Sequence, residues 1–235
     1  MRGSHHEVAR AYVLYRERRT QERARQAEPQ APSTPVLHVV DGERRVVLDL
    51  HRLRSLIESA CVGLGDDVQA EPILQETLRN LYDGVPLEEV HKAAILAART
   101  LIEKDPDYSF ATARLLLHTI AREVLGREVA PAERAQAYID NFPQCIRKGV
   151  ENQLLDERLL QFDLDRLGAA LQAERDLQFD YLGLQTLYDR YFLHVRKTRI
   201  ELPQVFFMRV AMGLALGEID REARAIEFYE VLSRF

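Results

Sequence analysis

The chain has 235 residues, of which 46% are hydrophobic and 29% are charged, and its formal net charge is −5. This composition predicts a globular protein with one or two ordinary cores, and the acidic balance argues against nucleic acid as a partner, because nucleic acid favours a clustered basic surface. The sequence has neither an apolar run of ~20 residues that could cross a membrane nor the apolar core of a signal peptide, so we expect a cytoplasmic protein without a membrane partner.

The beginning of the chain is predicted to carry little fold information. Residues 1–6 (MRGSHH) are typical of a vector-encoded histidine tag, so we do not interpret His5 and His6 as metal ligands. Apolar side chains then recur at helical spacing and predict a helix over residues 7–27. The proline-containing stretch 28–35 (EPQAPSTP) predicts a linker that ends this helix.

A hairpin and four helices are predicted next. The β-prone runs 36–40 and 46–48 flank Asp41-Gly42, and Asp-Gly favours a type I′ turn because both central positions of that turn need positive φ. Four helical patterns follow, each bounded by glycine or proline signals: DLHRLRSLIESACVGLG, PILQETLRNLYDGV, PLEEVHKAAILAARTLIEKDP and TARLLLHTIAREVLG. The apolar stripe of the first helix consists of Leu50, Leu53, Ile57, Ala60 and Cys61.

The second half of the chain is also helical by pattern, which makes the predicted fold mainly α with one small β element. PAERAQAYIDNFPQCIRKGVENQLL predicts a helix that breaks at Pro143 and resumes. HVRKTRIELP predicts a short ribbon, PQVFFMRVAMGLALG a buried central helix, and Asp220 the N-cap of the last helix. Another predicted helix, LLQFDLDRLGAALQ, has core-facing leucines at i, i+4, i+7 and i+11, which are Leu160, Leu164, Leu167 and Leu171.

No catalytic residue and no metal site is predicted from spacing alone. Glu88 and His91 have the i, i+3 spacing of half a di-iron motif, but the sequence has no second Glu-x-x-His to complete such a centre. Cys61 and Cys145 match no metal or redox spacing, so we interpret them as inert thiols.

Three stretches resemble known protein families. The run FDLDRLGAALQAERDLQFDYLGLQTLYDRYFLHVRKTRIELPQVFFMRV closely resembles the N-terminal helical region of class I ribonucleotide reductase large subunits. The hairpin with its four helices, and the tract LYDGVPLEEVHKAAILAARTLIEKDPDYSFATARLLL, resemble an ATP-cone, a regulatory nucleotide-binding module. The segment VARAYVLYR resembles the closing helix of a truncated first cone. The domains implied are that remnant (7–27), an ATP-cone-like domain (36–126), and a helical domain (127–235) ending before the catalytic barrel.

The resemblance also implies a nucleotide pocket that is partly dismantled. Family cones carry a lysine-arginine pair before the Asp-Gly turn, where this chain has Val39 and Val40. Arg52, His91 and Arg122 lie at or near the other basic positions of the family, and they form the candidate nucleotide site. We expect ATP and dATP to bind weakly or not at all, because a polyphosphate needs converging donors. The alternative is that both arginines are solvated and the histidine has a capping or core role.

The function implied is that of a non-catalytic N-terminal fragment, the regulatory and structural part of a ribonucleoside-diphosphate reductase large subunit, an oxidoreductase that makes deoxyribonucleotides. Its partner would be the rest of that subunit, and it would need no cofactor, because the radical and redox cysteines of the family lie in the barrel. The alternative is a stand-alone, library-derived or engineered helical protein that binds a ligand or a partner. We also expect a homodimer through apolar residues of the last helices, namely Phe206, Phe207, Met208, Phe228, Tyr229, Leu232 and Phe235.

Overall fold

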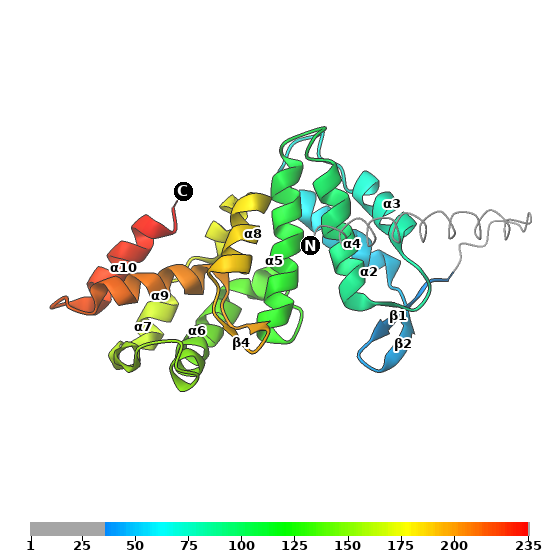
Figure 1. Cartoon of the computed structure of the whole chain (residues 1–235). Helices are drawn as coiled ribbons and strands as arrows, with labels where there is room; N and C mark the ends of the chain where they lie inside the picture. The colour runs from blue at the N-terminus through cyan, green and yellow to red at the C-terminus, as the bar shows by residue number, and fades with distance from the viewer. Residues whose placement is uncertain (1–35, 235) are drawn as a thin grey trace, which may run out of the picture. The chain divides into compact units, whose positions relative to one another are not determined.

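The computed structural model describes residues 36–234, and one compact unit spans His38–Phe235. The predicted tag, first helix and linker (1–35) and Phe235 lie outside the described residues. The predicted mainly α class is confirmed (Figure 1). The α-helices are α2 (Leu50–Cys61), α3 (Ala70–Asn80), α4 (Leu87–Thr100), α5 (Tyr108–Leu125), α6 (Arg134–Glu151), α7 (Leu164–Ala169), α8 (Tyr181–Arg190), α9 (Pro203–Ala215) and α10 (Arg221–Leu232).

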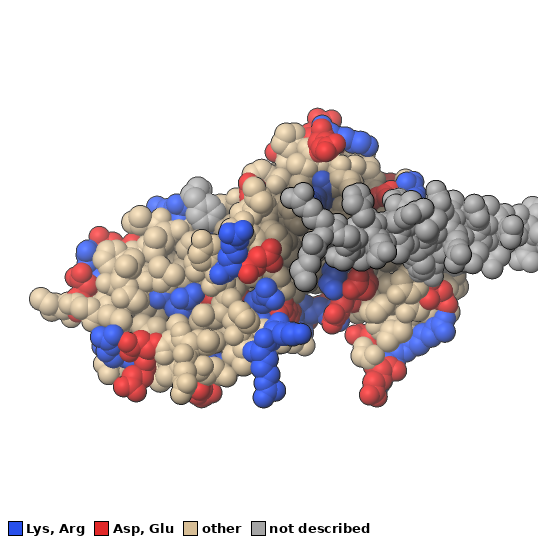
Figure 2. Space-filling view, viewed as in Figure 1, with Lys and Arg blue, Asp and Glu red and all other residues tan. Residues whose placement is uncertain are grey.

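Short 3-10 helices and strands connect the α-helices. The 3-10 helices are η1 (Pro131–Glu133), η2 (Glu157–Gln161) and η3 (Ala173–Gln178). The strands are β1 (His38–Asp41), β2 (Arg44–Val47), β3 (Val85–Pro86), β4 (His194–Val195) and β5 (Thr198–Arg199). Within residues 36–234, no helix combines the length and the apolar character needed to cross a membrane. On the face seen in Figure 2, acidic and basic side chains are interspersed.

The predicted hairpin is present, but its turn differs from the prediction. Strands β1 and β2 pair antiparallel with Asp41 opposite Arg44, so Gly42 and Glu43 are the central residues of the turn. Gly42 has φ of +62°, whereas Glu43 does not have positive φ. The predicted type I′ turn centred on Asp41-Gly42 is therefore wrong, because Asp41 is used as the last residue of the strand. The short strand β3, which was not predicted, pairs parallel with β1 and completes a three-stranded sheet in the order β2-β1-β3.

The first predicted helical stripe is confirmed except at its start. Leu53, Ile57, Ala60 and Cys61 are buried along α2. Leu50 is exposed, because it is the first helical residue after the N-cap Asp49, whose side chain accepts a hydrogen bond from the Arg52 backbone N–H at 2.9 Å.

Two helix predictions for the second half are wrong. Helix α6 runs without interruption through the buried Pro143, and we attribute this to its packing against α7 and α9, which compensates for one lost backbone hydrogen bond. The leucine-rich stretch predicted as one helix forms η2 and α7, because the Asp163 side chain caps a new helix by accepting from Arg166 N at 2.9 Å. Leu164 and Leu167 are buried as predicted, whereas Leu160 is exposed.

The ribbon, the buried helix and the last N-cap are confirmed. Strands β4 and β5 pair antiparallel, α9 buries most of its length, and the Asp220 side chain accepts from Ala223 N at 3.2 Å. The expected exposed apolar surface of the last helices is smaller than predicted. Met208 and Tyr229 are completely buried inside the chain, because α9 and α10 pack closely against each other.

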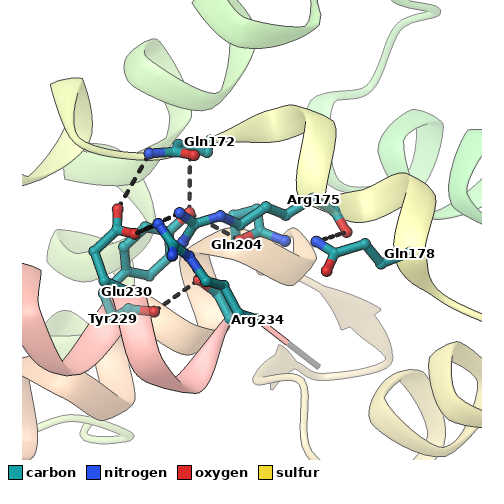
Figure 3. A network of polar contacts seen from close by, with 8 residues as sticks. Gln172, Arg175, Gln178, Gln204, Tyr229, Glu230 and Arg234 are labelled. Carbon is teal, nitrogen blue, oxygen red and sulfur yellow. Dashed lines mark hydrogen bonds and ion pairs between the residues drawn. The ribbon is translucent and has the colours of Figure 1, made fainter.

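A buried polar network ties η3 to α9 and α10 (Figure 3). The Gln204 side chain donates to Asp176 Oδ1 at 2.9 Å and accepts from the Tyr229 hydroxyl at 2.8 Å. The Tyr138 hydroxyl of α6 donates to Asp176 Oδ2 at 2.6 Å, and Arg175 forms an ion pair with Glu230 at 2.5 Å. Because these groups are paired inside the protein, the network fixes how four elements pack against one another.

Helix α5 has packing partners on two sides. It contacts α2 and α4 of the predicted cone-like region, and also α8, β5 and η3 of the following region (Figure 1). Its residue Glu123 accepts from the Tyr188 hydroxyl at 2.7 Å through Oε2 and from Arg199 N at 2.7 Å through Oε1. One carboxylate therefore joins the end of α5 to both α8 and the ribbon.

Candidate functional site

The structure brings the three candidate nucleotide-binding residues together around His91. This residue lies on α4 and is 8% exposed. Arg122 of α5 has its Nη1 3.1 Å from His91 Nδ1 and its Nη2 3.4 Å from an Asp41 carboxylate oxygen. Arg52 of α2 forms an ion pair with Glu128, which lies in the loop after α5. Both arginines are thus already paired with carboxylates of the chain.

A pocket of about 160 Å³ lies among the hairpin, α2 and α4, and both Arg52 and His91 line it. Its charged lining residues are Asp41, Asp49, Arg52 and Glu128, so acidic groups outnumber basic ones. This charge balance is unfavourable for a polyphosphate and favourable for a cation.

A second hollow shares His91 with the first and contains Arg122. Two of its lining residues are acidic, Glu88 and Glu123, and two are basic, Lys92 and Arg122. Across the two hollows, the described residues therefore provide no excess of positive charge for phosphate groups.

The valines that replace the expected lysine-arginine pair lie differently with respect to the first pocket. Val39 is 2% exposed and is part of the lining, together with Asp41 two residues further along β1. Val40 is absent from that lining, as expected for successive side chains that point to opposite faces of a strand. A basic side chain at position 39 would reach this pocket, whereas one at position 40 would not.

Two residues that were not predicted complete a cluster with His91. His118 of α5 contacts His91 edge to face, with ring centroids 5.3 Å apart, and Glu128 lies beside them. One potential ligand atom from each of the three residues lies within 4.8 Å of the others. Sequence spacing could not reveal this cluster, because its members come from two helices and a loop.

Both histidines of the cluster are neutral at pH 7. Burial, followed by the neighbouring His118 and Arg122, lowers the pKa of His91 to about 4. Burial also lowers the pKa of His118. In a neutral imidazole, one ring nitrogen has a free lone pair. This nitrogen can bind a metal ion or accept a hydrogen bond.

The two cysteines occupy separate buried positions on α2 and α6. Burial raises the pKa of the Cys61 thiol to about 11, and burial also raises the pKa of Cys145. Both thiols are therefore protonated near neutral pH and poorly nucleophilic.

Comparison with known proteins identifies the family. The profile of the family described as "Ribonucleotide reductase, all-alpha domain" matches residues 177–235. The chain is 41% identical to a ribonucleoside-diphosphate reductase subunit alpha of Chlamydia muridarum, over 98% of this chain and 22% of that protein. It is 34% identical to the subunit alpha of Helicobacter pylori (strain 26695), over 80% of this chain and 23% of that protein.

A more distant relative is the ribonucleoside-diphosphate reductase large subunit of Danio rerio, with 29% identity over 84% of this chain and 24% of that protein. The chain thus spans less than a quarter of the length of these relatives. The similarity to these relatives extends beyond residues 177–235 and covers most of this chain. The chain therefore belongs to the ribonucleotide reductase large-subunit family and corresponds to the N-terminal part of such a subunit.

Proposed function

We propose that this chain is a non-catalytic, regulatory and structural part of a ribonucleoside-diphosphate reductase, the activity for which its relatives are named. The observation that carries the proposal is the burial of Cys61 and Cys145, each on a different helix and each with a raised thiol pKa. The resemblance implies that reduction of a ribonucleotide uses a radical cysteine and a pair of redox cysteines. Two isolated, protonated thiols do not provide that set.

An assay of ribonucleoside-diphosphate reduction tests the lack of activity. The chain is mixed with a radical-generating subunit of a relative and with a dithiol reductant, and we expect no turnover above background. Turnover that disappears in Cys61→Ser or Cys145→Ser would overturn the proposal. The same mixture with a complete large subunit from a relative serves as the positive control.

The regulatory part of the proposal concerns residues 36–126 as an ATP-cone-like domain with a weakened nucleotide site. In support of this, Arg52 is held by Glu128 and Arg122 by Asp41, so a polyphosphate would have to displace carboxylates that are already bound. The valine at position 39 removes one charge-assisted contact, at roughly 1.5–3 kcal/mol, which weakens binding by about tenfold to a hundredfold. The domain would then serve mainly as a structural spacer.

Isothermal titration calorimetry with ATP and dATP tests the weakened site. We expect weak or undetectable binding to the unmodified chain and a gain in affinity for Val39→Lys, because position 39 lines the pocket. Val40→Lys is the matched control, since it adds the same charge next to position 39 but outside the lining. Low-micromolar dATP affinity of the unmodified chain would contradict the proposal, and so would equal gains in the two variants.

A further inference from the structure

We propose that His91, His118 and Glu128 form a binding site for a divalent transition-metal ion of the Zn²⁺ type. Two imidazoles and one carboxylate are a ligand set that such ions accept, with a fourth position left for water or another ligand. The inference goes beyond the proposed regulatory function, because it requires neither nucleotide binding nor the rest of a reductase.

The distances between the three side chains suit a metal site before the ion binds. The potential ligand atoms lie within 4.8 Å of one another. Ligand atoms around a tetrahedral Zn²⁺ are separated by about 3.3 Å, from metal–ligand distances of about 2.0–2.1 Å. Glu128 lies in the loop after α5, so a change of its rotamer can move its carboxylate relative to the two imidazoles. The two histidines are already in contact across the interface of α4 and α5.

An unpaired nitrogen supplies an independent reason for a ligand at this position. His118 Nε2 is buried and has no hydrogen-bond partner. Buried polar atoms are rarely left unpaired, because they lose their hydration without replacement. A metal ion bound to His118 Nε2 would supply the missing partner.

The charged groups around the cluster define how the ion would be held. Arg52 donates to Glu128 Oε2, so Oε1 is the carboxylate oxygen available to the ion while the arginine orients the carboxylate from outside. The acidic residues Asp41 and Asp49 line the same pocket and favour a cation. Arg122 opposes the ion by its charge.

Arg122 also opposes the ion through a hydrogen bond. Its Nη1 lies 3.1 Å from His91 Nδ1, so a ring nitrogen that accepts this bond leaves the proton on Nε2. Metal binding at Nε2 moves the proton to Nδ1, which can then no longer accept from Arg122. The guanidinium must turn away, and Asp41, at 3.4 Å from its Nη2, is the nearby carboxylate that can retain it. Removal of the Arg122 guanidinium should therefore tighten metal binding.

The test is calorimetric titration of the full chain with ZnCl₂, combined with visible absorption of the Co²⁺ form. All proteins carry His5→Ala and His6→Ala, because the histidines at the beginning of the chain would bind metal themselves. We expect one ion per chain, and a loss of affinity of about tenfold or more in His118→Ala and in Glu128→Gln. His51→Ala is the matched control, since His51 is an exposed histidine on α2, and its affinity should be unchanged.

The outcomes separate a metal site from a purely structural cluster. Absence of Zn²⁺ binding, or unchanged affinity in Glu128→Gln, would overturn the proposal. Glu128→Gln keeps the size of the side chain in a loop, so the test does not depend on whether His118→Ala folds. Arg122→Ala should bind Zn²⁺ more tightly than the parent, and unchanged or weaker binding would contradict the assigned ligand geometry.

Discussion

Replacement of Tyr138 by phenylalanine removes only the hydroxyl oxygen and so tests how much the buried polar network contributes to stability. The hydroxyl is fully buried and donates to Asp176 Oδ2 at 2.6 Å, and Gln204 donates to Oδ1 of the same carboxylate at 2.9 Å. Burial raises the pKa of Asp176 from 3.8 to about 6. At pH 7 the buried carboxylate of Asp176 is therefore ionised. Tyr138→Phe removes one of the two side chains that donate a hydrogen bond to it.

The expected cost depends on the charge of Asp176. A hydrogen bond to an ionised group contributes about 1.5–3 kcal/mol, and a bond between neutral groups about 0.5–1.5 kcal/mol. Asp176 has a higher pKa in the folded state than the unfolded value of 3.8, so the folded state binds its proton more tightly and the carboxyl group is mostly neutral at pH 5. We expect Tyr138→Phe to lower the free energy of unfolding by about 2–3 kcal/mol at pH 7 and by about 1 kcal/mol at pH 5.

Urea unfolding followed by far-UV circular dichroism at the two pH values measures this difference. Tyr191→Phe is the matched control, because Tyr191 is largely exposed and should change the free energy of unfolding by less than about 0.5 kcal/mol. Equal losses for Tyr138→Phe at pH 5 and pH 7, or a loss at pH 7 no larger than that of the control, would refute the assigned charge and hydrogen bond of Asp176.

Other expected outcomes concern thiols, histidine and assembly. Cys61 and Cys145 should react with a thiol reagent at pH 7 only after unfolding, and rapid labelling of the native chain would contradict their burial. Burial lowers the pKa of His91 from 6.5 to about 4, so the contribution of His91 to the free energy of unfolding is complete above pH 6.5 and is lost as the pH falls toward 4. In His91→Gln the free energy of unfolding should therefore depend less on pH between these two values. We expect light scattering to show a homodimer. Val231→Asp (71% exposed on α10) should weaken the dimer, whereas the control Leu182→Asp (73% exposed on α8) should not. A monomeric parent chain would exclude the expected dimer.

Local signals in the sequence predicted most helices correctly, because capping and periodicity act within a few residues. Asp220 caps its helix as predicted, and the stripe of α2 is buried except at its first residue. The errors arose where distant packing decides the structure. Pro143 remains inside a helix because neighbouring helices hold it, and β3 pairs with a strand that is distant in the sequence.

The candidate site could be predicted only in part for the same reason. Resemblance to a family pointed to Arg52, His91 and Arg122, and the structure places them around one histidine. It did not point to His118 or Glu128, since a cluster built from two helices and a loop has no characteristic spacing. The carboxylate partners that neutralise both arginines were also beyond reach of the sequence, because ion pairs between distant residues depend on the tertiary fold.

The consecutive residues Arg122 and Glu123 connect the last turn of α5 to two different parts of the protein. Arg122 contacts His91 and Asp41, while Glu123 holds Tyr188 and the backbone of the β4–β5 ribbon. A rotation of this turn that released the arginine would also pull the glutamate against α8 and the ribbon, because the two side chains share one stretch of backbone. A metal ion at the histidine cluster that displaces Arg122 should therefore change the rate of amide hydrogen exchange in the β4–β5 ribbon. An unchanged rate there would show that the two contacts are independent.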